Sequence, residues 1–217
     1  MIGGCKHAPD ACLLRMYHND SVELFGCDIF APNTETFRVF HKFADLNYKQ
    51  IQHPYEIPYG DDFFDTIIAD GVLEHVPNDS ESLKELYRVL KTGGTLVISC
   101  LPNRYSYLEN LAAILGLPHH LRAYSMSQAR SILLHSGFVP FSTRYLQMMP
   151  SMSGLALLGT SKWLNVISSG LWGLNSFFEW LWPFNRLSSN LFLLARKVPG
   201  INWQKPSSFQ NVARKAA

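Results

Sequence analysis

The sequence lacks a large excess of charge of either sign. Its 217 residues include 19 lysines and arginines and 17 aspartates and glutamates, which gives a formal net charge of +2. The basic residues are scattered along the chain, whereas a nucleic-acid-binding surface requires basic residues that cluster on one face. We therefore expect no nucleic acid among the partners of this protein.

Paired cysteines are also lacking. Cys5, Cys12, Cys27 and Cys100 form no C-x-x-C pair, and the histidines do not have the spacing of a zinc site, so no metal is expected. Cys27 and Cys100 lie in apolar runs, where a free cysteine acts as a small buried hydrophobe. This usage, and the absence of a secretory signal after Met1, predict a reducing, cytoplasmic location.

What the sequence does contain is an alternation of apolar runs and helical patterns. Val22–Ile29, Asp65–Val72 and Thr95–Leu101 are apolar on both faces, which is typical of interior strands of a parallel sheet. Phe138–Met149 and Asn190–Val198 are predicted as two further strands. The pattern predicts an α/β fold, with a doubly wound, Rossmann-like sheet of mostly parallel strands and an antiparallel last strand.

Two helices carry start and stop signals. Asn78 is the predicted N-cap of the first, with Glu81 completing a capping box and Gly93-Gly94 ending the helix. Ser125 and Gln128 predict a second capping box of the same kind.

A series of short motifs follows the predicted strands in order. The motifs are Asp28, Ala44-Asp45-Leu46, Ile57-Pro58-Tyr59, Phe64-Asp65, Leu73-Glu74-His75 and Arg88-Val89-Leu90-Lys91-Thr92-Gly93-Gly94. In this order and at these spacings, the series resembles the class I S-adenosylmethionine-dependent methyltransferases, in their small-molecule branch. The resemblance covers roughly residues 2–100 and implies S-adenosylmethionine as the cofactor.

The resemblance also implies where the cofactor would bind. Ligands of open α/β sheets lie outside the carboxyl ends of the strands, where the strand order reverses. Asp28, which ends the second strand, would accept hydrogen bonds from the ribose hydroxyls. Asp45, with Leu46, is placed after the third strand, where the family contacts adenine, and Asp70 lies beside the methionine moiety. A turn or a helix cap is the alternative role for Asp28, and a plain loop position for Asp45.

The glycine-rich first loop is incomplete. Glycines there let the backbone approach the amino-acid end of the cofactor, and the next helix N-terminus attracts its carboxylate. Gly3 and Gly4 supply the start of this loop, but Cys5 and His7 stand where the family has further glycines. Because nothing precedes Ile2, the first strand is predicted to be missing, either through truncation, which we favour, or through loss of part of the cofactor site.

Histidines are the candidate proton acceptors. A hydroxyl acceptor needs a base, and histidine titrates near neutral pH. His120 is the first candidate and His119 the second, since this region caps the acceptor pocket in similar methyltransferases. His75 is a third candidate, although in the family Leu-Glu-His mostly marks a turn. Surface histidines without a catalytic role are the alternative for all three.

A hydrophobic segment over residues 154–184 precedes the last strand. Its apolar residues recur at steps of three and four, which predicts a helix with one apolar stripe, and Trp163, Trp172, Trp180 and Trp182 add amphipathic rings. Its uncharged stretch falls short of the ~20 residues of a spanning helix. Two interpretations stay open: a helical insertion packed on the domain, or an interfacial helix that lies on a membrane or receives a lipid-like acceptor.

These observations predict one methyltransferase domain over residues 1–198, followed by a polar tail over 199–217. The predicted function is methyl transfer from S-adenosylmethionine to a small, lipophilic acceptor, with peripheral membrane contact through 154–184. A catalytically inactive methyltransferase-like interaction module is the alternative, favoured by the defective first loop. A dinucleotide-dependent oxidoreductase is disfavoured, because it leaves the series from Phe64-Asp65 to Gly94 unexplained. The acceptor, the methylated atom and the oligomeric state are left open.

Overall fold

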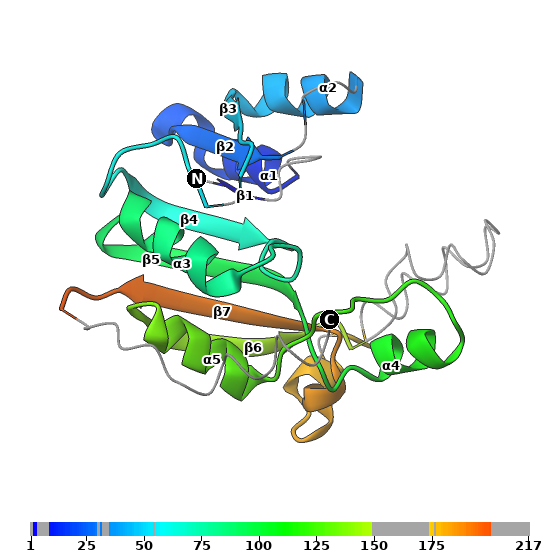
Figure 1. Ribbon diagram of the computed structural model, residues 1–217. Coiled ribbons are helices and arrows are strands. Elements are labelled where there is room, and N and C mark those ends of the chain that lie inside the picture. The colour runs from blue at the N-terminus through cyan, green and yellow to red at the C-terminus, as the bar shows by residue number, and fades with distance from the viewer. Residues whose placement is uncertain are drawn as a thin grey trace.

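Seven strands form one sheet in the computed structural model, which describes residues 2–3, 9–29, 31, 35–53, 55–148, 174–175 and 177–200. The strand order is β3-β2-β1-β4-β5-β7-β6 (Figure 1). The strands are β1 (Ile2–Gly3), β2 (Leu24–Asp28), β3 (Leu46–Gln50), β4 (Phe64–Asp70), β5 (Leu90–Pro102), β6 (Phe138–Leu146) and β7 (Asn190–Lys197). β7 is antiparallel to β5 and β6, and the other recorded pairs are parallel, which confirms the predicted fold class.

Helices cover both faces of this sheet. They are α1 (Pro9–His18), α2 (Glu35–Ala44), α3 (Asp79–Val89), α4 (Tyr107–Ile114) and α5 (Met126–His135), with 3-10 helices η1 (Asn19–Ser21) and η2 (Phe184–Leu187). α3 and α5 lie over the β4-β5-β7-β6 half in Figure 1. From β1 the chain adds β2 and β3 on one side, whereas from β4 it adds β5 on the other side. Because crossovers between parallel strands are right-handed, this reversal puts α1 and α2 on the face opposite to α3.

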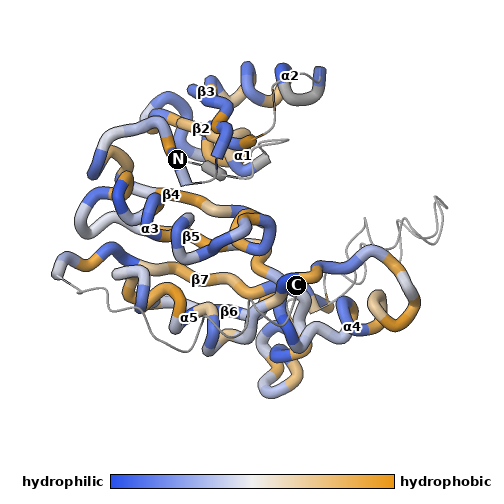
Figure 2. The backbone as a smooth tube through the Cα atoms, viewed as in Figure 1, coloured by the Kyte–Doolittle hydropathy of each residue, from blue (hydrophilic) through white to orange (hydrophobic). Residues whose placement is uncertain are grey.

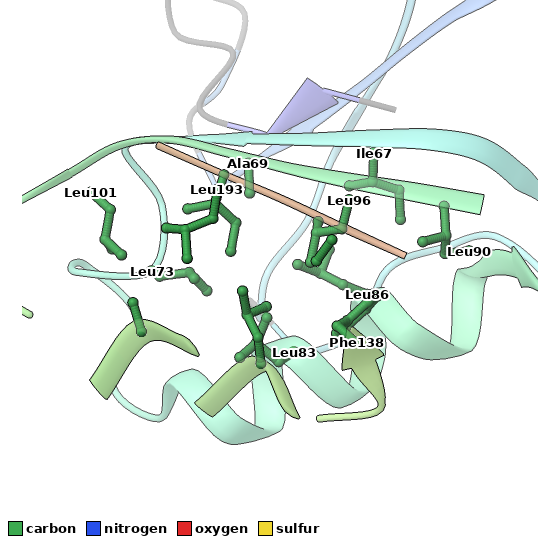
Figure 3. Close-up of a cluster of buried hydrophobic side chains, with 14 of the residues drawn as sticks. Ile67, Ala69, Leu73, Leu83, Leu86, Leu90, Leu96, Leu101, Phe138 and Leu193 are labelled. Carbon is green, nitrogen blue, oxygen red and sulfur yellow. The ribbon is translucent and has the colours of Figure 1, made fainter. Parts of the chain in front are cut away.

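The main hydrophobic core lies between the sheet and α3 and α5. Ile67, Leu96 and Leu193 extend from the strands toward Leu83 and Leu86 of α3 (Figure 3), and all five side chains are buried. A smaller cluster centred on the buried residues of α1, β2 and α2 fills the other face; these are Ala11, Leu24 and Ala44. The two clusters thus fill the space between the sheet and the helices on each of its faces, as in a doubly wound fold.

The centre of the sheet, where the first strand was predicted to be missing, holds the two-residue β1. Ile2 is paired with Gly26 of β2 and with Ile68 of β4, and Gly3 is paired with Ala69. The truncation of a longer first strand stays a prediction.

The start of α3 is capped differently from the prediction. Asn78 Oδ1 accepts from the backbone N–H groups of Ser80 at 3.1 Å and Glu81 at 3.3 Å, which confirms the N-cap. The N–H of Asn78 donates to the hydroxyl of Tyr55 at 2.7 Å, and the Glu81 carboxylate pairs with Lys84 at 2.9 Å. The predicted reciprocal bond from Glu81 is therefore replaced by these two contacts.

The second capping box is confirmed, whereas the end of α3 is corrected. Ser125 and Gln128 exchange both bonds of the box at the start of α5. α3 ends at Val89 and not at Gly93, because Leu90 already belongs to β5. Gly93, with φ 78°, lies in the first part of β5, where the register against β4 shifts.

The predicted insertion over 154–184 lies mostly outside the described residues, as does the tail beyond residue 200. Within the described ranges, no helix has the length and apolarity that crossing a membrane requires.

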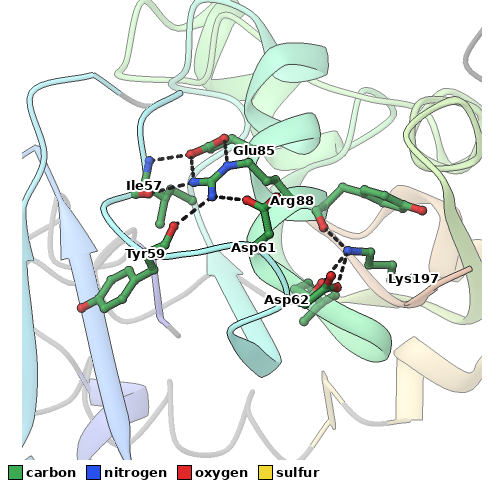
Figure 4. A network of polar contacts seen from close by, with 9 residues as sticks. Ile57, Tyr59, Asp61, Asp62, Glu85, Arg88 and Lys197 are labelled. Carbon is green, nitrogen blue, oxygen red and sulfur yellow. Dashed lines mark hydrogen bonds and ion pairs between the residues drawn. The ribbon is translucent and has the colours of Figure 1, made fainter. Parts of the chain in front are cut away.

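Arg88 ties the loop before β4 to α3 (Figure 4). Its guanidinium donates to the Glu85 carboxylate at 2.6 Å, to Asp61 at 2.7 Å, and to the carbonyls of Tyr59 at 2.9 Å and Ile57 at 3.0 Å. A planar guanidinium can serve all these acceptors together. This arginine therefore has a structural role.

Lys197 forms a second, buried polar contact, also at the C-terminal end of α3 (Figure 4). Its side chain is 7% exposed, and Nζ donates to the carbonyls of Tyr87 and Leu90 at 2.7 Å each and to Asp62 at 2.8 Å. The last carbonyls of a helix lack partners within it, so a cation there caps it. Lys197 thus joins β7 to the end of α3.

We predict that Lys197→Met lowers the free energy of unfolding by about 1–3 kcal/mol, because it leaves buried carbonyls of Tyr87 and Leu90 without donors. Urea unfolding measured by circular dichroism tests this. Lys91→Met is the matched control, since its ion pair with Asp65 is exposed and should contribute little. Equal losses in the two variants would contradict the capping role.

Candidate active site

The carboxyl ends of the parallel strands place acidic residues along one edge of the sheet. Gly3 ends β1, Asp28 ends β2 and Asp70 ends β4. The strand order reverses between β1 and β4, and this is where open α/β sheets bind ligands. Asp28 and Asp70 lie at strand ends as predicted, whereas Gly3, predicted at the start of the glycine-rich loop, is the last residue of β1. The binding roles of all three remain predictions. Gly4 lies outside the described residues.

Asp45 and Leu46 lie at the opposite edge, so their predicted place after the third strand is wrong. α2 continues to Ala44, Asp45 forms the turn with φ 48°, and β3 begins only at Leu46. Leu46 packs against the small core formed by α1, β2 and α2. The sequence pattern placed the strand before these residues, where the structure has the amphipathic α2.

The chain that follows β3 supports the end of β2 instead. The N–H of Ile51 donates to the Asp28 carbonyl at 2.9 Å, and the Gln50 side chain donates to the Ile29 carbonyl at 3.1 Å. The N–H of Ile29 donates to Asp28 Oδ1 at 2.7 Å, which fixes the carboxylate at the strand end. Asp28 is half-buried there.

The polar side chain beside Asp70 is that of Ser99, its partner across the β4–β5 ladder, and a bulge in β5 follows directly. The register of β5 against β7 shifts between Ile98 and Leu101, and Cys100 takes φ 54°. Ser99 Oγ donates to Asp70 Oδ1 at 2.6 Å. Bulges of this kind re-aim side chains, and a left-handed non-glycine residue marks local strain. Cys100 is consequently exposed, which corrects its predicted burial, whereas Cys27 is buried as predicted.

Asp10 adds a second carboxylate near Asp70, from the first turn of α1. Burial and, secondly, the negative charge of Asp70 raise the pKa of Asp10 above its ordinary value. Two acids that repel each other in a partly buried place favour a positively charged ligand group.

Glu74, His75 and His120 form a separate group beyond the end of β4. The Glu74 side chain is 3% exposed, and His75 Nε2 lies 3.7 Å from Glu74 Oε1. The rings of His75 and His120 have centroids 6.1 Å apart. Burial raises the pKa of Glu74. The structure thus brings two of the three predicted histidines together around a buried carboxyl.

Glu109 holds His120 in place. The His120 N–H donates to Glu109 Oε2 at 2.8 Å, and His120 Nδ1 lies 3.2 Å from Glu109 Oε1. Ser106 caps α4 by accepting from the Glu109 N–H at 3.1 Å, and the Ser106 N–H donates to the Asn103 carbonyl at 3.0 Å. Because that N–H is already satisfied, the Glu109 carboxylate need not close a capping box and reaches His120.

His119, the second predicted base, lies apart from this group. Its Nδ1 is 3.0 Å from the carbonyl of Leu117 in its own exposed loop. A small apolar pocket between the sheet and α3 and α5 is also separate from the strand ends; its lining includes Leu83, Ile98 and Leu133. We assign it to packing of the core.

Sequence reasoning missed three residues of the site, namely Asp10, Ser99 and Glu109. Asp10 could have been found as an acid in the first turn after the glycine-containing loop. Glu109 lies three residues after Ser106, at the position of a capping-box acid. That pattern predicts a bond to the Ser106 N–H, whereas the Glu109 carboxylate contacts His120. Ser99 reaches Asp70 because the two residues are partners across the parallel ladder of β4 and β5, a register that no residue pattern indicates.

Comparisons with known proteins relate part of the chain to a family. Residues 3–98 match the sequence model of the family described as a methyltransferase domain. The fold of the chain is that of the class I S-adenosylmethionine-dependent methyltransferases. Solved structures with this fold include the YcgJ protein of Bacillus subtilis, with a TM-score of 0.58 and 17% identity over 92% of this chain and 91% of that one. A Methanosarcina mazei methyltransferase gives a TM-score of 0.60 at 15% identity, covering 91% of both chains.

Curated methyltransferases match over shorter stretches. A ubiquinone/menaquinone biosynthesis C-methyltransferase of Geotalea daltonii is 49% identical over 43 residues, which are 20% of this chain and 18% of that protein. A probable S-adenosylmethionine-dependent methyltransferase of Mycobacterium tuberculosis is 30% identical over 84 residues, 39% of this chain and 30% of the relative. The matches therefore span less than a third of these two relatives.

We predict that Asp10→Asn raises the melting temperature at neutral pH and that the gain disappears below about pH 4. The pKa of Asp10 is raised in the folded chain, so its ionised form destabilises the fold, and this penalty is lost once the carboxyl is protonated. Differential scanning calorimetry at pH 7.5 and pH 4 measures the effect. Asp45→Asn, an exposed acid at the opposite edge, is the control. A gain that is the same at both pH values would refute the assignment.

Proposed function

We propose that this class I methyltransferase transfers a methyl group from S-adenosylmethionine to a small, lipophilic acceptor. The observation that carries the proposal is the gathering of Asp10, Asp28 and Asp70 near the carboxyl edge where the strand order reverses. This edge fits a nucleoside that carries a positive charge.

The residues at the edge fit the parts of the cofactor separately. Asp28 would accept from the ribose hydroxyls, as the family resemblance implies. Asp10 and Asp70, whose charges disfavour each other, would hold the cationic amino-acid end. Gly3 ends β1 beside them and brings the backbone close. The bound cofactor supplies an electrophilic methyl group, and the chain positions it and excludes water.

Activation of the acceptor is assigned to the group of Glu74, His75 and His120. A hydroxyl or amine acceptor must lose a proton, and histidine exchanges protons near neutral pH. Glu109 beside Nδ1 orients the His120 ring and leaves Nε2 for this task.

The α4 region supports a lipophilic acceptor. All side chains of α4 are exposed or half-buried, and Ile114 and the following Leu115 are 82% and 61% exposed. Leu121, in the loop that carries His120, is 95% exposed. Figure 2 shows this hydrophobic stretch at the outer end of α4. Exposed apolar surface of this kind marks contacts with apolar partners.

The segment before β7 adds aromatic rings on the same side of the fold. Trp180, Trp182 and Phe184 are mainly exposed. Buried Asn103 donates to the carbonyls of Arg186 at 2.8 Å and Ser188 at 2.7 Å, which fixes this segment to the loop before α4. Tryptophan rings prefer the interface between lipid and water. We therefore propose a cytoplasmic protein that contacts a membrane peripherally and takes its acceptor from there.

A tRNA acceptor has less support. A tRNA U34 carboxymethyltransferase of Nautilia profundicola is 31% identical over 114 residues, 46% of this chain and 37% of that protein. However, basic residues exceed acidic ones by only two here, while RNA binding depends on a basic surface.

We predict that isothermal titration with S-adenosylmethionine shows one site per chain, weakened at least tenfold by Asp28→Ala and by Asp70→Asn. Both changes remove a carboxylate that the proposal assigns to the cofactor. Asp45→Asn is the matched control and should bind as the wild type does, because Asp45 lies at the other edge. The inactive-module alternative predicts no binding by the wild type.

If the protein contacts a membrane peripherally, we predict that it floats with vesicles of phosphatidylcholine and phosphatidylglycerol. The double variant Trp180→Ser/Trp182→Ser should lose most of this association, since both rings are exposed. Phe43→Ser on α2 removes an exposed aromatic ring remote from this surface and should float like the wild type. Equal flotation of all three proteins would contradict the proposed surface.

A further inference from the structure

We propose that Glu74, His75 and His120 bind one divalent transition-metal ion beside the methyl-transfer site. The proposal rests on the proposed function for its purpose, but its geometry stands independently. Each of the three residues offers one ligand atom, and these atoms lie within 4.8 Å of one another. No metal was expected from the sequence, because the spacing of Glu74-His75 and His120 does not follow a zinc motif.

The kind of ligand set indicates the kind of ion. Two imidazoles and one carboxylate suit zinc, iron, cobalt or nickel, and the set leaves further coordination positions open. Ligand atoms about 2.0–2.2 Å from a tetrahedral ion lie roughly 3.4 Å from one another. His75 Nε2 and Glu74 Oε1 are already 3.7 Å apart. His75 and His120 are 69% and 42% exposed, so their rings can close the remaining distance.

The buried carboxyl of Glu74 is an independent indication of a ligand. In the part of the chain that the structure describes, Glu74 Oε2 is a buried atom without a hydrogen-bond partner. An unsatisfied buried oxygen is unfavourable, and a bound cation would satisfy it.

Glu109 contacts His120 in the way that a carboxylate contacts a metal-bound histidine. Metal-bound histidines usually donate their second ring N–H to a carboxylate, which fixes the tautomer and directs the other nitrogen to the metal. Glu109 Oε1 lies 3.2 Å from His120 Nδ1, so Nε2 is the nitrogen left for the ion. Glu109 is therefore a positioning residue for the site.

A metal at this place would activate a hydroxyl acceptor in place of the histidines, because their free ring nitrogens would bind the ion and no longer act as bases. An oxygen bound to a divalent cation has a lowered pKa and gives its proton to solvent near neutral pH. The oxygen keeps the electron pair that forms the new bond to the methyl carbon, while the carbon–sulfur bond breaks and its electrons neutralise the sulfonium. The substrates of such a site would thus be lipophilic molecules that carry a hydroxyl group.

The test uses Co²⁺ as the probe, because its visible absorption reports its coordination. The purified whole chain is stripped with a chelator and titrated with Co²⁺ in the absence of S-adenosylmethionine. We expect one ion per chain, and binding at least tenfold weaker in His75→Gln and in His120→Gln. Glu109→Gln should weaken binding about tenfold or more through loss of the orienting carboxylate.

His119→Gln is the matched control, because His119 neighbours His120 but bonds to its own loop. It should bind Co²⁺ like the wild type, and circular dichroism should show all variants folded. Equal binding by the wild type and by the His75 and His120 variants, or no binding by the wild type, overturns the metal site. Neither result touches cofactor binding, which the titration with S-adenosylmethionine tests separately.

Discussion

The pairing of β1 with both β2 and β4 is the constraint on which the rest of the site depends. Ile2 and Gly3 are the residues of β1 that join the β3-β2 part of the sheet to the β4-β5-β7-β6 part. Parallel pairing on both sides sends the carboxyl ends of β2 and β4 to the same edge. Asp28 and Asp70 therefore share that edge, and the chain leaving β1 leads to Asp10 at the start of α1.

The residues that reveal the family are largely those that build the fold. Arg88 connects α3 to the loop before β4, and Gly93 takes a left-handed backbone conformation in the first part of β5. The site residues come from other positions: strand ends, the first turn of α1 and the loop after α4. This separation explains how a chain can match the fold and motifs of a family while the match leaves its acceptor open.

Most of the fold could be predicted from the sequence because it depends on local patterns. Apolar runs located the longer strands, and Ser125 with Gln128 located the start of α5. The prediction for Asp45 failed because the family resemblance put a strand before it, where the structure has the amphipathic helix α2. Glu109 was missed because a tertiary contact with His120 sets its role. The predicted burial of Cys100 was wrong because a bulge in β5 directs its side chain.

The central claim is that one ligand contacts the carboxyl ends of β2, β4 and β5 together. Hydrogen–deuterium exchange with and without S-adenosylhomocysteine tests it most directly, since protection is read along the chain. We expect S-adenosylhomocysteine to slow exchange in the segments around Asp28, Asp70 and Ser99. Exchange around Asp45 and Gly93, at the opposite edge, should stay unchanged. Protection confined to the opposite edge, or to only one of the three strand ends, would contradict a shared cofactor site.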